Sequence, residues 1–364
     1  MCMPLNVEQF SVLRLIRTHH IGPQTLWKLM AQFHSAASIV ENWPEIQANM
    51  KRKIDLVSEK IVITEIEKTF KSEARFLFHS DPSYPASLHS VADRPPVLSF
   101  KGTLALLAQK KVAIVGARNA SSHGCRLAYL MAKELGRFGW RTVSGLARGI
   151  DAAAHQGSLE SGTIAVLGNG IQTIYPEENK KLYEEITEKG LLLSEFSFDT
   201  QPHMGNFPKR NRLISALVQG IVVVEAAHQS GSLLTAQYGL EMGKDIFAVP
   251  GSPMDPRCCG SNRLIKQGAV LTESAQDVLE ILDQGQWVPH YKENREKKKK
   301  ILASEKKNES SILDFLSTVP LSVDELADLT QLRMDQLSSL LTDLELEGQI
   351  MKHPGNKVSR VLQG

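Results

Sequence analysis

The segment NFPKRNRLIS, residues 206–215, combines an aromatic ring, a proline and three cations. These residues are Phe207, Pro208, Lys209, Arg210 and Arg212. Proline is typical of the first turn of a helix, where free backbone N–H groups and the helix dipole already favour anions. Cations at such a helix start predict an anion site, and the adjacent ring gives a face on which a base can stack. This combination is expected of a single-stranded nucleic-acid binder, but it also fits a capped surface helix with solvated cations.

Turns rich in glycine and serine recur after short apolar segments. They cover residues 116–122, 144–151, 168–170, 225–232 and 250–252. Glycine lets a ligand approach the backbone closely, and serine hydroxyls together with helix-start amides can hold phosphate oxygens. Two of the turns also carry an arginine, Arg118 and Arg148. A single glycine is more often a turn residue than a ligand contact, but the repetition predicts an anion-binding surface.

The apolar segments predict the element that positions these turns. Short runs rich in β-branched residues alternate with helical segments, at 111–115, 141–143, 163–167, 191–193, 221–224 and 245–249. Nearly continuous apolar strands separated by helices indicate a mainly parallel sheet covered on both faces, which is a doubly wound α/β fold. In such a sheet ligands bind at the carboxyl ends of the strands, where the turns are expected to lie.

Signatures of cofactor binding and catalysis are missing from the turns. Gly116 is followed by Gly124 and not by the GxGxxG spacing, and Val143–Ser144 stands where a ribose-binding acid would be expected. The chain also lacks GxxxxGK[ST], which argues against a P-loop NTPase. Asp151 and His155 are four residues apart, but we interpret Asp151 as a helix cap and His155 as a packing or hydrogen-bonding residue. We therefore predict neither a bound cofactor nor an enzyme.

Composition is that of an ordinary soluble protein. Of the 364 residues, 42% are hydrophobic and 23% are charged, and the formal net charge is +2, so any nucleic-acid surface must be local. No CxxC pair occurs among Cys2, Cys125, Cys258 and Cys259, so neither a metal site nor a disulfide framework is expected. No signal peptide and no membrane-spanning run is visible, so we expect a cytoplasmic protein without membrane contact.

Four regions follow one another along the chain. Residues 1–72 have helical periodicity, 73–285 carry the sheet pattern, 286–309 are a charged flexible linker and 310–364 have the order of a winged helix. Residues 21–29 resemble a helix-hairpin-helix turn whose amides could meet a phosphate, although a plain helical connection fits them better. Similarly, Lys297–Lys300 could touch DNA nonspecifically, but a solvated tether is the better interpretation.

The winged-helix region is predicted from two helical stretches, 322–329 and 334–347, followed by a two-stranded wing around Pro354–Asn356. In such modules the second helix normally reads DNA. Here that helix carries four acids, Asp335, Asp343, Glu345 and Glu347. Because like charges oppose phosphate contact, we favour a protein-contact or regulatory role for this region.

Seven ordered motifs resemble those of one protein family. They are GARNAS, SGLARGIDAAAHQG, GTIAVLGNGI with IYP, LLSEF, NFPKRNRLIS, VVVEAAHQSGSLLTA and IFAVPGSPMDPRCCGSNRLIKQGA. Their order is similar to that in the DNA-processing protein A (DprA, also called Smf) family, and the resemblance covers about residues 75–285. The flanking helical region and the winged helix fit the longer members of that family.

This resemblance implies an extended Rossmann-like domain that binds single-stranded DNA without a nucleotide cofactor. It also implies a homodimer formed through that domain, which protects incoming strands during natural transformation and loads the RecA recombinase onto them. The residues that fall on the family's DNA-binding pattern come from three turns and the cationic segment. They are Gly116, Arg118, Ser121, Ser144, Gly145, Arg148, Phe207, Lys209, Arg210, Asn211, Arg212, Ser230, Gly231 and Ser232.

One departure from the family pattern concerns the residues before Phe207. Several relatives carry a lysine there, whereas this chain has Gln201–Gly205, in which His203 would be only partly charged near neutral pH. Two other functions stay open. One is a nucleotide-processing hydrolase similar to the nucleoside monophosphate phosphoribohydrolases, although this chain has EAAHQSGSLLTA where those enzymes use PGGxGTxxE. The other is a scaffold whose winged helix recruits a partner and whose sheet edge binds nothing.

Overall fold

The computed structural model describes residues 5–49, 52–89, 91–283, 312–313, 315–316, 320–330, 332 and 334–361. The chain forms two compact units, Met1–Gly285 and Gln286–Gly364. The expected linker, residues 286–309, lies outside the described residues, as does its lysine run.

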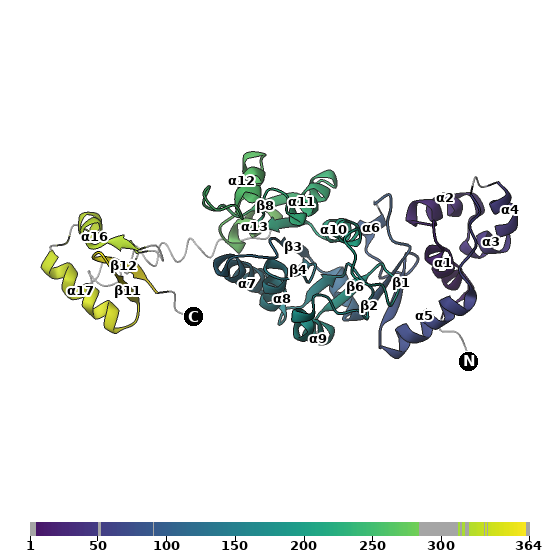
Figure 1. The fold of residues 1–364 in the computed structure, drawn as a ribbon, viewed down its shortest axis with the longest axis horizontal. Coiled ribbons are helices and arrows are strands. Elements are labelled where there is room, and N and C mark those ends of the chain that lie inside the picture. The colour runs from purple at the N-terminus through teal and green to yellow at the C-terminus, as the bar shows by residue number, and fades with distance from the viewer. Residues whose placement is uncertain are drawn as a thin grey trace. The chain divides into compact units, whose positions relative to one another are not determined.

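Helices make up the N-terminal part of the first unit (Figure 1). They are α1 (Val7–Arg17), α2 (Pro23–Phe33), α3 (Ala36–Glu41), α4 (Trp43–Ala48) and α5 (Glu59–Lys71). A capping box starts α1, because the Asn6 side chain accepts from the backbone N–H of Gln9 at 2.8 Å and the Gln9 side chain accepts in return at 3.1 Å. Gly22 is the N-cap of α2 and Pro23 is its first residue. Most of residues 21–29, which resemble a helix-hairpin-helix turn but fit a plain helical connection better, therefore belong to this helix.

A mainly parallel sheet forms the body of the first unit. Its order is β1-β2-β6-β5-β4-β3-β7-β8-β9, and only the pairings β1 with β2 and β2 with β6 are antiparallel. The strands are β1 (Arg75–Phe78), β2 (Val97–Gly102), β3 (Lys111–Val115), β4 (Arg141–Ser144), β5 (Thr163–Val166), β6 (Leu191–Ser194), β7 (Gly220–Val223), β8 (Asp245–Ala248) and β9 (Val270–Leu271). The doubly wound fold is therefore confirmed, and β1, β2 and β9 extend it beyond the predicted strands.

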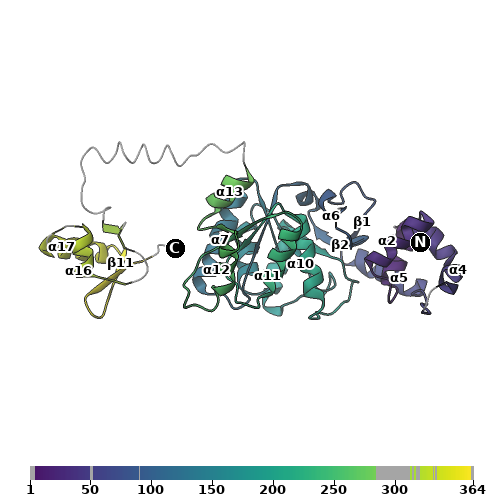
Figure 2. The ribbon, with the colours of Figure 1, turned by 90° about the horizontal axis from the view of Figure 1, so that it is seen from above.

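Helices cover both faces of this sheet (Figures 1 and 2). They are α6 (Ala86–His89), α7 (Ser122–Arg137), α8 (Ile150–Ser158), α9 (Lys180–Lys189), α10 (Asn206–Leu217), α11 (Gly231–Glu241), α12 (Cys259–Lys266) and α13 (Ala275–Leu282), with 3₁₀ turns at Leu104–Ala108 and Glu177–Asn179. Alternate residues of β3 enter different cores: Val112 and Ile114 pack with α7, α8 and α13, whereas Ala113 and Val115 pack with α10 and α11. Burial on both faces explains why the strand sequences are apolar throughout.

The strand order reverses between β3 and β7. From β3 the chain moves outward through β4, β5 and β6, and it then returns to the other side of β3 as β7. In open α/β sheets such a reversal separates the turns at the carboxyl ends and leaves a crevice there. α10 lies in the connection that returns from β6 to β7, so its N-terminal residues reach this edge of the sheet.

The second unit has the elements of a winged helix, as the sequence predicts. They are β10 (Leu321–Ser322), α16 (Val323–Thr330), α17 (Met334–Leu346), β11 (Ile350–His353) and β12 (Lys357–Arg360). The strands pair in the order β10-β12-β11, and the wing turns at Gly355 and Asn356, both with positive φ. On α17 and just after it Asp343, Glu345 and Glu347 are exposed, and Glu345 pairs with Lys352 at 2.5 Å.

Candidate nucleic-acid interface

A cleft of about 750 Å³ lies where the strand order reverses. Its walls are the turns after β3, β4 and β7, the first turns of α10 and α11, and the pair Pro256–Arg257. A smaller pocket adjoins the cleft, and Arg118, Phe207 and Arg210 line both. Turns that are far apart in the sequence therefore meet at one edge, as the carboxyl ends of parallel strands require.

Most of the site residues predicted from the sequence line the cleft or the smaller pocket. They are Gly116, Arg118, Gly145, Arg148, Phe207, Arg210, Asn211, Ser230, Gly231 and Ser232. The remaining four, Ser121, Ser144, Lys209 and Arg212, line neither. Asn211 also joins two walls, because its side-chain amide donates to the carbonyl of Gly231 at 3.1 Å.

Phe207 is half-buried between two other side chains. The Arg118 guanidinium lies over its ring, 4.7 Å from the centroid, and the Tyr175 ring lies 6.1 Å away at an interplanar angle of 30°. Arg118 itself is exposed. A cation over an aromatic face is attracted by the ring quadrupole, so Arg118 covers this face of Phe207. A base can reach that face only if Arg118 moves aside.

Arg210 lies beneath the cleft and not on its rim. It is 5% exposed, and its guanidinium lies 3.8 Å from the Asp151 carboxylate. Burial raises the pKa of Asp151, and the charge of Arg210 opposes that effect. The same carboxylate accepts from the backbone N–H of Gly145 at 3.1 Å and of Ala147 at 3.4 Å. Arg210 and Asp151 therefore join α10 to the turn after β4.

The expectation that Asp151 caps a helix is wrong. Gly149 is the N-cap of α8, and Asp151 is the second helical residue, which uses its carboxylate to hold the preceding turn. The interpretation of His155 is confirmed. Its Nδ1 lies 2.8 Å from the Thr163 hydroxyl, and burial lowers its pKa to about 3, so it is a neutral packing residue at pH 7.

Two glycines of the predicted pattern make room for neighbouring protein atoms. A Cβ on Gly145 would overlap the Arg210 guanidinium, and one on Gly116 would lie 2.6 Å from the Ile150 side chain. Close packing of α10 and α8 on the sheet edge is therefore sufficient reason for glycine at these positions. Their backbone can still face a ligand, since both line the cleft or the smaller pocket.

Two of the predicted residues outside the two pockets, Ser121 and Ser144, have hydrogen-bond partners within the protein. Ser121 is the N-cap of α7 and donates its hydroxyl to Glu225 at 2.5 Å. Ser144 is buried and donates to the carbonyl of Ile114 at 2.7 Å. Lys209 is exposed on α10. We had expected Ser121 and Ser144 to face phosphate, but these bonds direct their hydroxyls into the fold.

Arg212 is not part of the cleft, contrary to what the sequence suggests. It is 7% exposed, and its guanidinium pairs with Glu195 at 2.5 Å and with Asp93 at 3.0 Å. Helical periodicity does not explain the difference from Lys209, because residues three apart on a helix lie on the same side. The difference comes from the two acids that pack on Arg212. Here Glu195 follows β6 and Asp93 precedes β2.

Three cations near the cleft edge are accessible to solvent. Arg118 is exposed, Arg148 pairs with Glu178 at 3.1 Å with both side chains 60% exposed, and Arg257 pairs with Asp255 at 2.7 Å. Sequence reasoning missed Arg257, which lines the cleft, and Tyr175, which lines the smaller pocket. Both stand within the quoted motifs, and the position of Arg257 after β8 was the available signal.

The segment before Phe207 supplies no cation to the cleft. Residues 201–205 contain only His203 as a basic side chain, and His203 Nδ1 accepts from the backbone N–H of Gly205 at 3.1 Å. Met204 reaches the cleft instead and is 84% exposed. An exposed thioether at this place can contact an apolar or aromatic surface, but it cannot pair with phosphate.

Comparison of the sequence with models of known protein families identifies the family of this chain. Residues 75–283 match the family model described as DNA recombination-mediator protein A, residues 6–67 the DprA-like N-terminal HHH domain, and residues 296–356 the DprA winged helix domain. The chain belongs to the DNA recombination-mediator protein A family. The resemblance inferred from the seven motifs is therefore confirmed.

Relatives within this family cover most of the chain. It is 31% identical to Protein Smf of Synechocystis over 395 residues, which covers 98% of this chain and 99% of the relative. It is 38% identical to Protein Smf of Escherichia coli over 283 residues, covering 76% and 74%. The solved structure of DNA processing protein A from Streptococcus pneumoniae superposes with a TM-score of 0.65 at 32% identity, covering 77% of this chain and 99% of that one.

A second solved structure, of DNA processing protein A from Helicobacter pylori, is described in terms of its single-stranded DNA binding mode. It superposes with a TM-score of 0.54 at 30% identity and covers 58% of this chain and 96% of that one. Among the helices that our structure describes, none is long and apolar enough to cross a bilayer. Within the same residues, no cluster of three or more His, Cys, Asp or Glu side chains is arranged to hold a metal ion.

Proposed function

We propose that this chain binds single-stranded DNA in the cleft at the carboxyl edge of its sheet and acts by binding, not by catalysis. The observation that carries the proposal is the position of Arg118 over Phe207 at the mouth of that cleft. A cation and a stacking ring at one place match the two parts of a nucleotide, its phosphate and its base. Membership of the recombination-mediator family supports the same function.

Binding in this proposal exchanges one contact of Arg118 for another. In the structure the guanidinium lies over the Phe207 ring, 4.7 Å from its centroid. An arriving strand offers a phosphate, which pairs with the guanidinium, and a base, which takes its place on the ring. Stacking on an aromatic side chain contributes about 1–3 kcal/mol per base and does not depend strongly on base identity, so the proposed binding is sequence-tolerant.

The proposed contacts fall into two groups. Arg118, Arg148 and Lys209 are exposed cations and would meet phosphates directly, together with the backbone of Ser230–Ser232 at the start of α11. Most of the other residues of the predicted set shape the floor and walls of the cleft. They are Gly116, Gly145, Phe207, Arg210 and Asn211, of which Phe207 also supplies the stacking face. Ser121, Ser144 and Arg212 do not line the cleft and would support it from within the fold.

The wider role that we propose follows the family. The chain would act in the cytoplasm as a homodimer formed through residues 73–285, protect incoming single strands and load the RecA recombinase onto them. Residues 1–72, the linker at 286–309 and the winged helix at 310–364 are proposed as separate regions. The exposed acids of α17 and the adjacent turn, among them Asp343 and Glu345, favour a protein partner over duplex DNA for the last region.

A binding titration tests the central proposal. Single-stranded and duplex oligonucleotides of the same length are compared by gel shift and anisotropy at several salt concentrations. If Arg118, Arg148 and Lys209 each meet one phosphate, the logarithm of the single-strand affinity should fall with the logarithm of salt at a slope of about −2. Arg118→Ala should then bring the slope closer to zero by about the contribution of one phosphate. Equal affinity for duplex, or an unchanged slope in the variant, would contradict the proposed site.

Recombinase loading is tested separately. Deletion of residues 310–364 should leave single-strand affinity unchanged if the cleft is the DNA site, whereas association with RecA measured by pull-down decides whether the winged helix recruits that partner. Loss of DNA binding on deletion would move the DNA site to the winged helix. Release of free base from nucleotides by the purified protein would revive the hydrolase alternative.

A further inference from the structure

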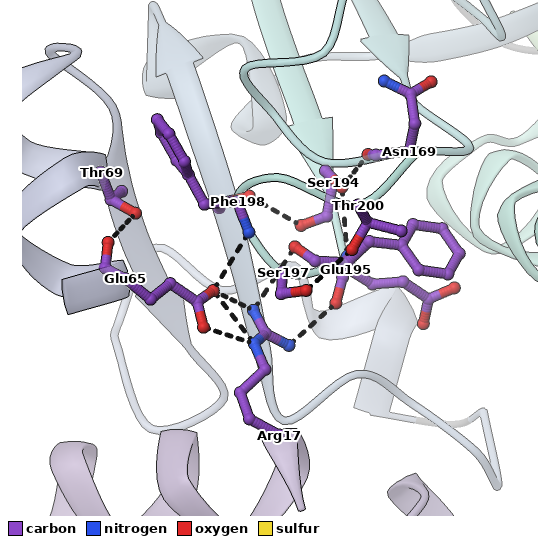
Figure 3. Close-up of polar contacts among 11 residues, drawn as sticks. Arg17, Glu65, Thr69, Asn169, Ser194, Glu195, Ser197, Phe198 and Thr200 are labelled. Carbon is purple, nitrogen blue, oxygen red and sulfur yellow. Dashed lines mark hydrogen bonds and ion pairs between the residues drawn. The ribbon is translucent and has the colours of Figure 1, made fainter. Parts of the chain in front are cut away.

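Arg17, the last residue of α1, reaches from the N-terminal helices to the segment that follows β6. Its Nε donates to both carboxylate oxygens of Glu65 on α5, each at 3.0 Å. Its Nη1 and Nη2 donate to the backbone carbonyls of Glu195 at 3.3 Å and Phe196 at 3.4 Å (Figure 3). Glu65 in turn accepts from the backbone N–H of Phe198 at 3.3 Å. The pair therefore holds residues 195–198 from both sides.

The pair is shielded from water. The side chains of Arg17 and Glu65 are 11% and 9% exposed. A buried pair of this kind is costly to break, because removal of one partner leaves the other charged and unpaired. A nearby pair at the same junction, Lys68 with Asp199, is different: the two side chains are 51% and 60% exposed, so the pair is expected to contribute little.

Residues 195–198, which Arg17 and Glu65 hold, are connected to the cleft by hydrogen bonds and packing. Phe196 donates its backbone N–H to the Ser194 hydroxyl at 3.1 Å, and that hydroxyl donates to the carbonyl of Asn169 at 2.6 Å. The neighbouring Gly168 packs so closely on Phe207 that a Cβ there would lie 2.9 Å from the ring. Residues 195–205 also form the connection into α10, at whose start Phe207 stands.

A second tie links the N-terminal helices to the same helix α10. The Trp27 indole on α2 donates to the carbonyl of Arg94 at 2.9 Å, and the Arg94 guanidinium lies 4.0 Å from the centre of the Trp27 ring. The residue before it, Asp93, pairs with Arg212 on α10. Glu195, whose carbonyl Arg17 holds, pairs with Arg212 as well. The N-terminal helices thus contact Glu195 directly and reach Asp93 through its neighbour Arg94, and both acids pair with Arg212.

We propose that the N-terminal helices are a positioning element of the DNA site, in which Arg17 and Glu65 fix residues 195–198 so that α10 presents Phe207 to the cleft. This inference depends on the proposed function. Arg17 does not line the cleft, so it acts through the segment that it holds and not on DNA. The role differs from the phosphate contact considered for residues 21–29, because it requires no nucleic acid at the N-terminal helices.

The test uses the full chain and a fluorescein-labelled oligothymidine, with Arg17→Ala compared against Arg14→Ala. Arg14 lies on the same helix and contacts only the N-terminal part, through Glu59 at 2.7 Å and the Val57 carbonyl at 3.0 Å. We expect Arg17→Ala to weaken binding about fivefold or more, the lower end of usual coupling between sites, with the salt slope of the wild type. Arg14→Ala should bind as the wild type does, and Arg17→Lys should restore part of the loss.

Hydrogen exchange gives the readout that a general loss of stability would not produce. Amides of residues 195–205 should exchange faster in Arg17→Ala than in Arg14→Ala, while those of β3 and β4 stay unchanged. If Arg17→Ala does not fold, Glu65→Gln replaces it, because this change keeps the side-chain shape and removes the charge. Glu65→Gln should also bind more weakly than Arg14→Ala and exchange the amides of residues 195–205 faster.

Each outcome decides between the two proposals. Wild-type protein that fails to bind the oligonucleotide would overturn the proposed function and this inference together. Wild-type protein that binds while Arg17→Ala and Glu65→Gln bind equally well would overturn only the inference. If Arg17→Ala binds more weakly and its salt slope is also closer to zero by about the contribution of one phosphate, Arg17 contacts DNA directly. That result would contradict a positioning role.

Discussion

Two layers of charge lie at the carboxyl edge of the sheet, and they differ in what surrounds each guanidinium. In the upper layer Arg118 lies on an aromatic face and Arg148 beside a carboxylate, and both are accessible to solvent. In the lower layer Arg210 and Arg212 are 5% and 7% exposed and are paired with buried acids. The upper cations can exchange partners at little cost, whereas the lower ones cannot leave theirs.

The difference follows from desolvation. Exposed ion pairs contribute between about 0 and 1 kcal/mol, so a phosphate can replace the partner of Arg148 readily. A buried pair that loses one member keeps an uncompensated charge, which costs about 3–5 kcal/mol. The lower layer is therefore a structural floor that fixes the cleft, and the upper layer supplies the groups that meet a ligand.

The largest effect is expected in the lower layer. Asp151→Ala leaves the Arg210 guanidinium buried without its carboxylate and frees the amides of Gly145 and Ala147, so the free energy of unfolding should fall by about 3–5 kcal/mol. Urea denaturation followed by circular dichroism measures this. The matched control is Asp255→Ala, which breaks the more exposed pair with Arg257 and should lower the free energy of unfolding much less. Equal losses in the two variants would remove the distinction between the layers.

A pH dependence should arise from His155, which is fully buried on α8. Burial depresses its pKa to about 3, below its unfolded value, so its stabilising contribution is present above about pH 6.5 and is lost as the pH falls toward 3. Between pH 7 and pH 5 the wild type should lose about 2 kcal/mol of unfolding free energy through this group.

His155→Gln, which cannot titrate, should lose less over the same interval, as measured by urea denaturation at pH 7 and pH 5. His203→Gln, at an exposed histidine, serves as the matched control variant. If both variants depend on pH alike, His155 is not the group responsible.

In the upper layer the stacking ring should carry the largest share of affinity. Phe207→Ala removes the face on which a base can lie, so binding of an oligothymidine should weaken by about 1–3 kcal/mol for one base, while the salt slope stays at the wild-type value. Anisotropy titrations at three salt concentrations measure both quantities. Phe138, which is 45% exposed at the end of α7 and outside the cleft, serves as the matched aromatic control. An altered slope in Phe207→Ala would show that the ring and the phosphate contacts are not separate.

Sequence periodicity was sufficient for the centre of the fold but not for its edges. The six predicted strands agree with the observed ones to within one residue at each end, because strands buried on both faces are apolar throughout. β9 has only two residues, and β1 directly follows the long helix α5, so neither separates from its neighbours as an independent apolar run. β2 pairs antiparallel with β6, which the alternation of strands and helices gives no reason to expect.

For the site, residue type and motif position identified the right segments but not their exposure. Nothing near Arg210 or Arg212 in the sequence indicates burial, because their partners Asp151 and Glu195 come from other elements. Conversely, Tyr175 lies in a quoted motif without a local sign that its ring will approach Phe207. Whether a cation is exposed or buried depends on the acids that pair with it in the folded protein. Because those acids are distant in the sequence, no local sequence pattern predicts the exposure.

The smallest expected effect concerns the pair Arg148 and Glu178 in the upper layer. Both side chains are 60% exposed, so Glu178→Gln should change the unfolding free energy by no more than about 0.5 kcal/mol. The same change removes a competitor for the Arg148 guanidinium, and single-strand affinity should rise up to about fivefold at low salt, which corresponds to the upper limit for an exposed pair.

Arg148→Ala in the Glu178→Gln background supplies the control, because it should cancel the gain if the freed guanidinium meets a phosphate. A gain that persists without Arg148 would come from the lost negative charge alone. The salt slope separates the two cases, because Arg148→Ala should bring the slope closer to zero by about the contribution of one phosphate only if Arg148 makes the contact. Weaker binding in Glu178→Gln would mean instead that the carboxylate holds Arg148 in its productive position. In that case the upper layer, like the lower one, would be organised by its acidic partners.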